Sequence, residues 1–291
     1  MTPPAVRAFT LFVHDRCQPL DLHDGEATHR TSKEMALSLW EALAVFAAGI
    51  GAGTINTIVG SGTLITFPVL LATGLPPVTA TVSNALGLIP GSVSGAIGYR
   101  AELRGRRRLV LRLGAASVVG GLAGAMLLLT LPATAFETIV PVLVALALVL
   151  VVLQPRISAR VQRRRARTGT AAKADGGPVL FGGLLLASVY GGYFTAAQGI
   201  IYLSLMGMLL DDTLQRLNAV KNVLSAVVNS IAALFFLFVA DFEWTAVLLI
   251  AVGSAIGGQV GAKVGRRLSP RILRTFVLVV GTVAIVQLLL R

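Results

Sequence analysis

The chain has 291 residues, 55% of them hydrophobic, and its 25 basic against 13 acidic residues give a formal net charge of +12. A mean hydropathy of +0.81 excludes a soluble nucleic-acid-binding protein, the class in which such a charge is common. The basic residues are clustered between long stretches that contain none, such as 34–99 and 113–155. Because charge is costly in the hydrocarbon of a bilayer, this pattern predicts an all-α, polytopic membrane protein.

Residues 1–35 form a polar, aperiodic tail that we expect to be disordered. The tail has no basic start followed by an apolar run, so it does not resemble a cleavable signal; a disordered extension or a misassigned start codon fits better. The single cysteine, Cys17, excludes an intrachain disulfide, and the three histidines, His14, His23 and His29, lie in the same solvated tail. We therefore expect no metal and no other cofactor.

About ten apolar segments follow the tail. The second and the seventh are too short to span a bilayer as a straight helix, which needs about 20 residues. Both come after a polar stretch broken by glycine, so we expect short, broken helices there. The ten segments are Ala36–Gly53, Thr63–Gly74, Val78–Tyr99, Leu109–Leu131, Ala133–Leu153, Val179–Tyr193, Gln198–Leu210, Thr213–Val239, Trp244–Val264 and Ile272–Leu290.

The order of the segments recurs, which indicates an internal duplication. The first membrane repeat is 36–154, the second is 178–291, and the basic stretch 155–177 is the predicted cytoplasmic linker between them. In each repeat a glycine-broken stretch precedes the short segment. The next long segment then begins near an asparagine, which is Asn84 in the first repeat and Asn218 in the second.

The distribution of charge predicts the topology. If all ten segments cross and the linker is cytoplasmic, 20 of the 25 basic residues lie inside and 9 of the 13 acidic residues lie outside. If the two short segments were re-entrant, the basic cluster 263–274 would fall outside and Asp241 and Glu243 inside, against the positive-inside rule. Five crossings per repeat is an odd number, so we expect two inverted repeats, the architecture of secondary transporters that bind their substrate near the middle of the membrane.

Polar residues within the apolar segments are the candidates for substrate binding, because each costs free energy unless it has a partner or a role. The stretch 60–63 is typical of the start of a half-helix, whose N–H groups and dipole suit a small anion. Close packing of helices is the alternative, since glycine and serine also permit it. The candidates are Asn56, Ser61, Gly62, Thr63, Asn84, Gln198, Gly199, Asn218, Lys221 and Asn222.

Lys221 is the least ordinary of these candidates, because it shares a helix face with Asn218, Asn222 and Ser225 inside an apolar segment. One interpretation is a cation at the cytoplasmic mouth of an anion pathway; the other is a lysine that snorkels to the membrane boundary. No acidic residue or histidine lies deep in any segment, so neither a carboxylate proton relay nor an enzyme active site is expected.

Several runs resemble the TauE/SafE family of sulfite exporters and related permeases, and the resemblance extends over residues 36–290. They are GAGTINTIVGSGTLITFP at 51–68, GLPPV at 74–78, SNA at 83–85, YGGYFTAAQG at 190–199, RLNAVKN at 216–222, GSAIGGQVGA at 253–262 and RRLSP at 266–270. The sequence departs from the commonest glycine-rich family pattern at 56–59 and 195–198.

The resemblance implies a multi-pass secondary transporter of the bacterial inner membrane. Its substrates would be small anions, often sulfur-containing, such as sulfite or sulfonates. The expected partners are this anion and the lipid bilayer; a homodimer is left open, and nucleic acid is not expected. The alternative from another class is a structural or assembly subunit of the membrane without transport activity.

Overall fold

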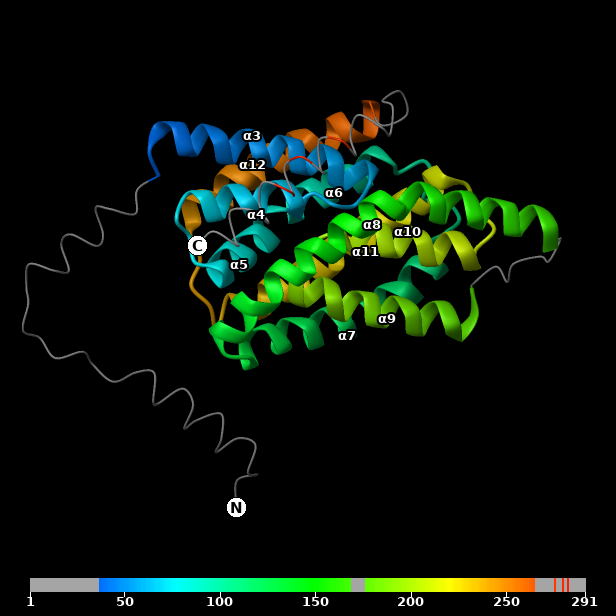
Figure 1. Cartoon of the computed structure of the whole chain (residues 1–291). Coiled ribbons are helices and arrows are strands. Elements are labelled where there is room, and N and C mark those ends of the chain that lie inside the picture. Colours follow the sequence, from blue (N-terminus) through cyan, green and yellow to red (C-terminus); the bar gives the residue numbers. More distant parts are fainter. Residues whose placement is uncertain (1–36, 169–175, 265–274, 276–278, 280–281, 283–291) are drawn as a thin grey trace, which may run out of the picture. The chain divides into compact units, whose positions relative to one another are not determined.

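The computed structural model describes residues 37–168 and 176–264 and the single positions 275, 279 and 282. Every regular element in these residues is a helix (Figure 1). The predicted tail 1–35 and nearly all of the tenth segment lie outside the described residues. The helices are α3 (Leu39–Ile58), α4 (Thr63–Ala72), α5 (Pro77–Gly87), α6 (Ile89–Gly98), α7 (Arg107–Thr130), α8 (Ala133–Thr168), α9 (Gly177–Phe194), α10 (Gln198–Leu209), α11 (Leu214–Phe236) and α12 (Trp244–Val264).

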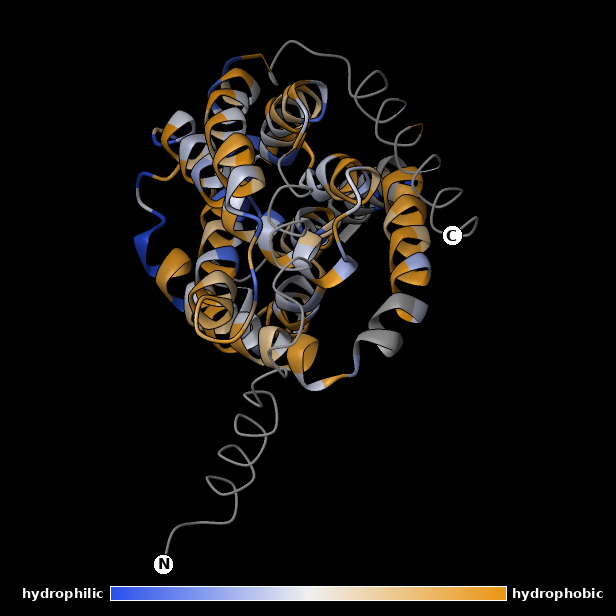
Figure 2. Cartoon of the chain, turned by 90° about the vertical axis from the view of Figure 1, so that its left-hand side faces the viewer, coloured by the Kyte–Doolittle hydropathy of each residue, from blue (hydrophilic) through white to orange (hydrophobic). Residues whose placement is uncertain are grey.

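Five of these helices, α3, α7, α9, α11 and α12, are long and apolar enough to cross a membrane. Shorter apolar helical stretches occur in α4, α8 and α10. Many residues of the outer helices are hydrophobic (Figure 2), and large apolar side chains such as Val119, Val142 and Leu248 are exposed. In water such surfaces would aggregate, whereas lipid tails cover them without cost, so the prediction of an all-α polytopic membrane protein is confirmed.

Helix α8 shows how the apolar pattern divides between protein and lipid. One face packs against α5 and α10, and the opposite face is exposed. The residues of the buried face and those of the exposed face each recur with the helical period. Both groups are apolar, which is typical of a helix between a protein core and a bilayer. The buried set is Val140, Val144, Ala147 and Val151, and the exposed set is Val142, Leu146, Val149 and Val152.

Two tight helix pairs join the repeats, α3 with α12 and α7 with α9 (Figure 1). Both pairs meet through glycine: a Cβ on Gly53 would stand 2.7 Å from the Cα of Ser254, and one on Gly124 would stand 2.8 Å from the amide of Tyr193. Small residues let helix backbones approach this closely. In each pair the first predicted segment of one repeat packs against the fourth predicted segment of the other. This reciprocal pairing agrees with a duplication, while the inverted orientation of the repeats stays a prediction.

The structure differs from two of the predicted segment boundaries. The segment Val78–Tyr99 consists of two helices, α5 and α6, which are separated at Leu88. Pro90 in the first turn of α6 has no N–H group to continue the helical hydrogen bonds from α5. Helix α8 continues past the predicted end at Leu153 to Thr168, so the first part of the predicted linker 155–177 is helical.

The connections at one end of the bundle are joined by charge. The Arg106 guanidinium lies 2.7 Å from the Asp212 carboxylate, which links the α6–α7 connection to the α10–α11 connection. Arg216 lies 3.6 Å from the same carboxylate. At the far end of α11, the amide of Glu243 donates a 3.0 Å hydrogen bond to the Ser83 hydroxyl. The basic loops therefore gather at one end and the acidic loop 240–243 follows the other end of α11.

We predict that the end with Arg106 is cytoplasmic. In a Cys17→Ser background, a cysteine at the exposed position Asp241 should react with an impermeant maleimide added to intact cells. A cysteine at the exposed position Arg104 should react only after the cells are permeabilised. The charge distribution requires this result because loops rich in lysine and arginine are retained in the cytoplasm. Labelling of the Arg104→Cys variant in intact cells would overturn the orientation.

Candidate functional site

The helix breaks of the two repeats lie against each other. The first break, 59–62, separates α3 from α4, and the second, 195–197, separates α9 from α10. The amide of Gly199 donates a 3.0 Å hydrogen bond to the carbonyl of Gly60, so backbone pairs with backbone across the repeats. Each break contains a residue with a left-handed backbone, Gly60 with φ of 89° and Ala197 with φ of 58°.

No side chain fits between these two breaks. A Cβ on Gly60 would collide with the Cα of Gly199 and stand 2.7 Å from its carbonyl carbon. A Cβ on Gly199 would in turn collide with the Cα of Gly60 and stand 3.0 Å from the Cδ of Lys221. The two glycines therefore set the contact between the repeats, and they place Lys221 next to it.

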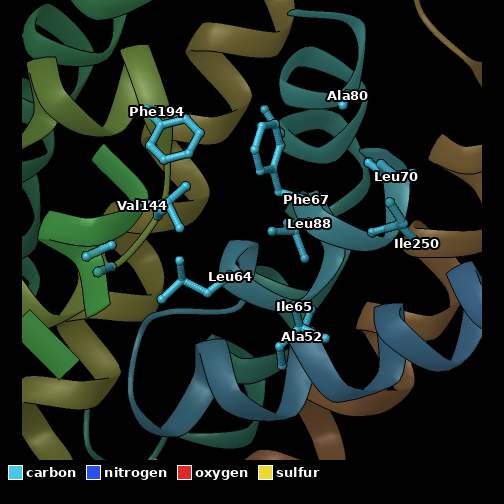
Figure 3. Close-up of a cluster of buried hydrophobic side chains, with 14 of the residues drawn as sticks. Ala52, Leu64, Ile65, Phe67, Leu70, Ala80, Leu88, Val144, Phe194 and Ile250 are labelled. Atoms are coloured by element: carbon cyan, nitrogen blue, oxygen red, sulfur yellow. The ribbon is translucent and has the colours of Figure 1, made fainter. Parts of the chain in front are cut away.

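Aromatic packing fixes the position of the breaks. Phe67 of α4 and Phe194 at the end of α9 make an edge-to-face pair with ring centroids 5.3 Å apart and an interplanar angle of 88°. Figure 3 shows this pair beside Leu64 and Val144, in the apolar core that α8 completes. The breaks are thus held between a rigid core on one side and α11 on the other.

Lys221 binds the end of α3 rather than the membrane boundary. Its side chain is 0% exposed, and its Nζ donates hydrogen bonds of 2.7 Å and 3.0 Å to the carbonyls of Asn56 and Thr57. The last carbonyls of a helix lack intrahelical partners and carry partial negative charge, which a lysine neutralises. Because the side chain is fully buried, it does not snorkel. Two of its three N–H donors are used, which leaves one for a further acceptor.

A buried polar stripe extends from Lys221 along α11. Asn218, Asn222, Ser225 and Asn229 recur with the helical period, and all four are buried. At 1.5 Å per residue, the stripe is about 16 Å long. Within the described residues no hydrogen-bond partner exists for the side-chain oxygens of Asn218 and Asn222, nor for either polar atom of Asn229. Asn229 is a polar residue of the same apolar segment that was not among the ten predicted binding residues, although its spacing from Asn222 places it on the same helix face.

Three more buried side-chain atoms without a partner in the described part of the chain come from the first break and from the helix ends beside the two breaks: Thr57 Oγ1, Ser61 Oγ and Gln198 Oε1. Thr57 lies beside the α11 stripe, because a Cβ on Gly95 would stand 2.6 Å from Thr57 Oγ1 and 3.2 Å from Asn222 Nδ2. A buried polar group without a hydrogen bond costs about 1–3 kcal/mol, so such a cluster indicates a polar ligand. We call the set Thr57, Ser61, Gln198, Asn218, Lys221, Asn222 and Asn229 the polar centre.

The structure does not bring every predicted residue to the polar centre. The Asn84 amide donates to Thr63 Oγ1 at 3.1 Å and accepts a hydrogen bond from Thr66, so Asn84 and Thr63 hold α4 against α5. The Asn56 amide donates to Ser92 Oγ at 3.2 Å, and only its carbonyl faces Lys221. These side chains have structural partners, which is the usual fate of polar groups between membrane helices.

The two helix starts predicted to bind an anion through their backbone amides differ in whether those amides already have an acceptor. At the start of α4, the amides of Ser61, Gly62 and Thr63 have no backbone acceptor among the described residues. The amide of Gly199, in contrast, already donates to Gly60. A Cβ on Gly62 would stand 2.5 Å from the carbonyl of Ala52 in α3, so packing alone requires this glycine. Replacing Gly62 therefore cannot test anion binding.

Comparisons with known proteins find a membrane transporter family and its members. A family model described as sulfite exporter TauE/SafE matches residues 45–288. The probable membrane transporter protein YfcA of Escherichia coli K12 is 28% identical over 251 residues, 84% of this chain and 88% of YfcA. A probable membrane transporter of Haemophilus influenzae is 24% identical, over 72% of this chain and 79% of its own. The probable membrane transporter protein ORF9 of a Sinorhizobium species is 32% identical over 105 residues, which are 36% of this chain and 40% of ORF9. No solved structure matches.

Proposed function

Because the chain belongs to the TauE/SafE family and is a multi-pass membrane transporter, we propose that it carries a small sulfur-containing oxyanion, such as sulfite or a sulfonate. We place it in the bacterial inner membrane, because its relatives are bacterial proteins named as membrane transporters and because its basic loops fit the positive-inside rule. The observation that carries the proposal is the polar centre, which combines a buried cation with unpartnered polar groups where the two helix breaks meet.

The charges of the polar centre favour an anion. Helices α4, α10 and α11 contain no acidic residue, and neither ion pair of the described residues includes Lys221. The carbonyls at the end of α3 would repel an anion, but Lys221 binds them and offsets their partial negative charge. The start of α4 supplies the partial positive charge of a helix N-terminus on the other side of the break.

The groups of the polar centre suit an oxyanion that must both enter and leave. The third N–H of Lys221 and the hydroxyls of Thr57 and Ser61 can donate to its oxygens. The asparagine amides can present either N–H or oxygen, so the stripe along α11 can accompany the ion or its water. The bond from Gly199 to Gly60 joins the repeats at this point, so a movement of one repeat against the other changes access to the site.

Asn229 gives the test. In proteoliposomes, the parent protein should carry sulfite or methanesulfonate, and Asn229→Leu should reduce this flux about tenfold, or by about 1.4 kcal/mol. The melting temperature of the variant should be equal or higher, because leucine has a similar size and removes two buried polar atoms without partners.

Asn84→Leu is the matched control for Asn229→Leu. Asn84 is equally buried but has two hydrogen-bonded partners, so its replacement should lower the melting temperature. If Asn229→Leu transported like the parent, Asn229 would not belong to the pathway. If the parent moved neither sulfite nor any sulfonate, the proposed substrate class would be wrong, and if it moved no solute at all, the structural-subunit alternative would return.

A further inference from the structure

A second place for an anion lies outside the polar centre. The end of α6 and the end of α12 enclose a cavity of about 610 Å³. Its polar lining comes from Arg100, Gln259 and Lys263, and its apolar lining from residues such as Ile97 and Ala262. The volume is far larger than the roughly 30 Å³ that a water molecule occupies in the liquid, so a hydrated small anion has room there.

The two cations of this cavity are free to bind a ligand. Arg100 and Lys263 are both exposed, and neither forms an ion pair with any residue that the structure describes. The acidic side chain of Asp212, which also lies at this end, is bound to Arg106 and Arg216 instead. Two unpaired cations in one cavity raise the local concentration of anions.

A small buried apolar cluster connects the wall of this cavity to α11, the helix of the polar stripe. Ala262, which lines the cavity, packs against Tyr99 and Ala219 in a small buried cluster. Tyr99 has the largest side chain of this cluster and is 2% exposed. On its far side, Ala219 belongs to α11, next to Asn218 and one turn from Asn222 of the polar stripe.

The packing below the cavity is tight. A Cβ on Gly98 would collide with the Cβ of Ala262, so α6 and α12 are in contact at the base of the cavity. Gln259 Nε2 donates a 2.9 Å hydrogen bond to the carbonyl of Ser94 and ties the same two helices together. These contacts and the buried Tyr99 close the base of the cavity on the side of α11.

We propose that the cavity of Arg100 and Lys263 is a second, peripheral binding site for the transported oxyanion, and that Tyr99 is the barrier between this site and the polar centre. The inference rests on the proposed function. It makes the cavity the cytoplasmic entrance, because the basic ends of α6 and α12 belong to the side that retains positive charge. Binding there is weak, since the cations are hydrated and the ion must leave again.

The test is the flux of sulfite into phosphatidylcholine proteoliposomes, which contain no anionic lipid. The double variant Arg100→Gln/Lys263→Gln should raise the KM for sulfite about tenfold while the maximal flux stays within about twofold, since only capture is impaired. Arg104→Gln is the control: Arg104 is exposed at the same end of the bundle and does not line the cavity, so its KM should equal that of the parent.

A lipid phosphate has the same chemistry as the free anion, and the lipid composition separates the two. If the double variant changed transport only in liposomes that contain phosphatidylglycerol, the cavity would hold a headgroup, and the entrance role would be wrong. If the parent carried sulfite and the double variant had the KM of Arg104→Gln, the inference would fail while the proposed function stood. A parent without sulfite flux would instead overturn the proposed function.

The proposed barrier at Tyr99 is tested separately, by the rate at which a cysteine behind it reacts with a thiol reagent. In a Cys17→Ser background, a cysteine at Asn218 should react slowly with a small water-soluble thiol reagent supplied from the cytoplasmic side. Adding Tyr99→Ala should speed this reaction about tenfold, which corresponds to a barrier lower by 1.4 kcal/mol, whereas Tyr99→Phe should leave it unchanged because the ring remains. Equal rates in all three proteins would show that Tyr99 does not close the pathway.

Discussion

A Gly60→Ala variant is expected to insert into the membrane and to lose transport. The added methyl group would collide with the backbone of Gly199, which cannot move away as a flexible side chain could. Overpacking of this kind costs about 1–3 kcal/mol, and the left-handed backbone of Gly60 adds about 1–2 kcal/mol for any residue with a Cβ. We expect the transport flux of this variant in proteoliposomes to fall to background level and its melting temperature to be lower than that of the parent.

Gly74→Ala separates the cost of the collision with Gly199 from the cost of placing a Cβ on a left-handed backbone. Gly74 has nearly the same backbone, with φ of 86°, but a Cβ there would meet no atom within 4 Å. Gly74→Ala should therefore keep most of its flux, and the reciprocal variant Gly199→Ala should fail like Gly60→Ala. If Gly60→Ala and Gly74→Ala lost equal flux, the contact between the breaks would not matter for transport.

Replacing Lys221 with methionine is expected to have a comparably large effect. Methionine fills a similar volume but leaves the buried carbonyl of Asn56 without its donor, at about 1–3 kcal/mol, and leaves the carbonyl of Thr57 with only the 3.4 Å hydrogen bond from Asn222 Nδ2. An effect of this size would lower the fraction of molecules in which the end of α3 keeps the transport-competent conformation by roughly 5- to 150-fold. We expect a strongly reduced sulfite flux at all concentrations and a lower melting temperature, both measured on purified protein.

Arg216→Met is the matched control, because Arg216 is a second basic residue of α11, five residues before Lys221, and its side chain is half-exposed. Its ion pair with Asp212 at 3.6 Å is long and hydrated, so we expect nearly the flux of the parent. A Lys221→Met protein with normal stability and a raised KM alone would assign Lys221 to the anion and not to the end of α3.

Sequence patterns predicted the membrane architecture because it depends on properties that each residue carries by itself. The gaps between basic clusters marked the apolar segments, and the glycine-broken stretches marked both short helices, which the structure has as Thr63–Ala72 and Gln198–Leu209. The boundary at Leu88 was not predicted, because a proline that follows it is tolerated in many membrane helices and stops only some of them.

The roles of the polar residues could not be predicted in the same way, because they depend on partners distant in the chain. Lys221 and Asn56 are separated by 165 residues, and no local pattern shows that one binds the carbonyl of the other. Asn84 and Asn218 occupy similar places in the sequence of the two repeats. Only the structure shows that the first is bonded to Thr63 and Thr66 while the oxygen of the second has no described partner.

The reciprocal pairing of α3 with α12 and of α7 with α9 has a consequence for biosynthesis. The ribosome completes α3 and α7 before their partners exist, so two glycine-lined faces must first pack against lipid or against the insertion machinery. Helix α9 is made soon after α7, whereas α12 is the last helix that the structure describes in full. Helix α3 therefore remains without this partner while α4 to α11 are made, and its contact with α12 can form only after α12 has been synthesised.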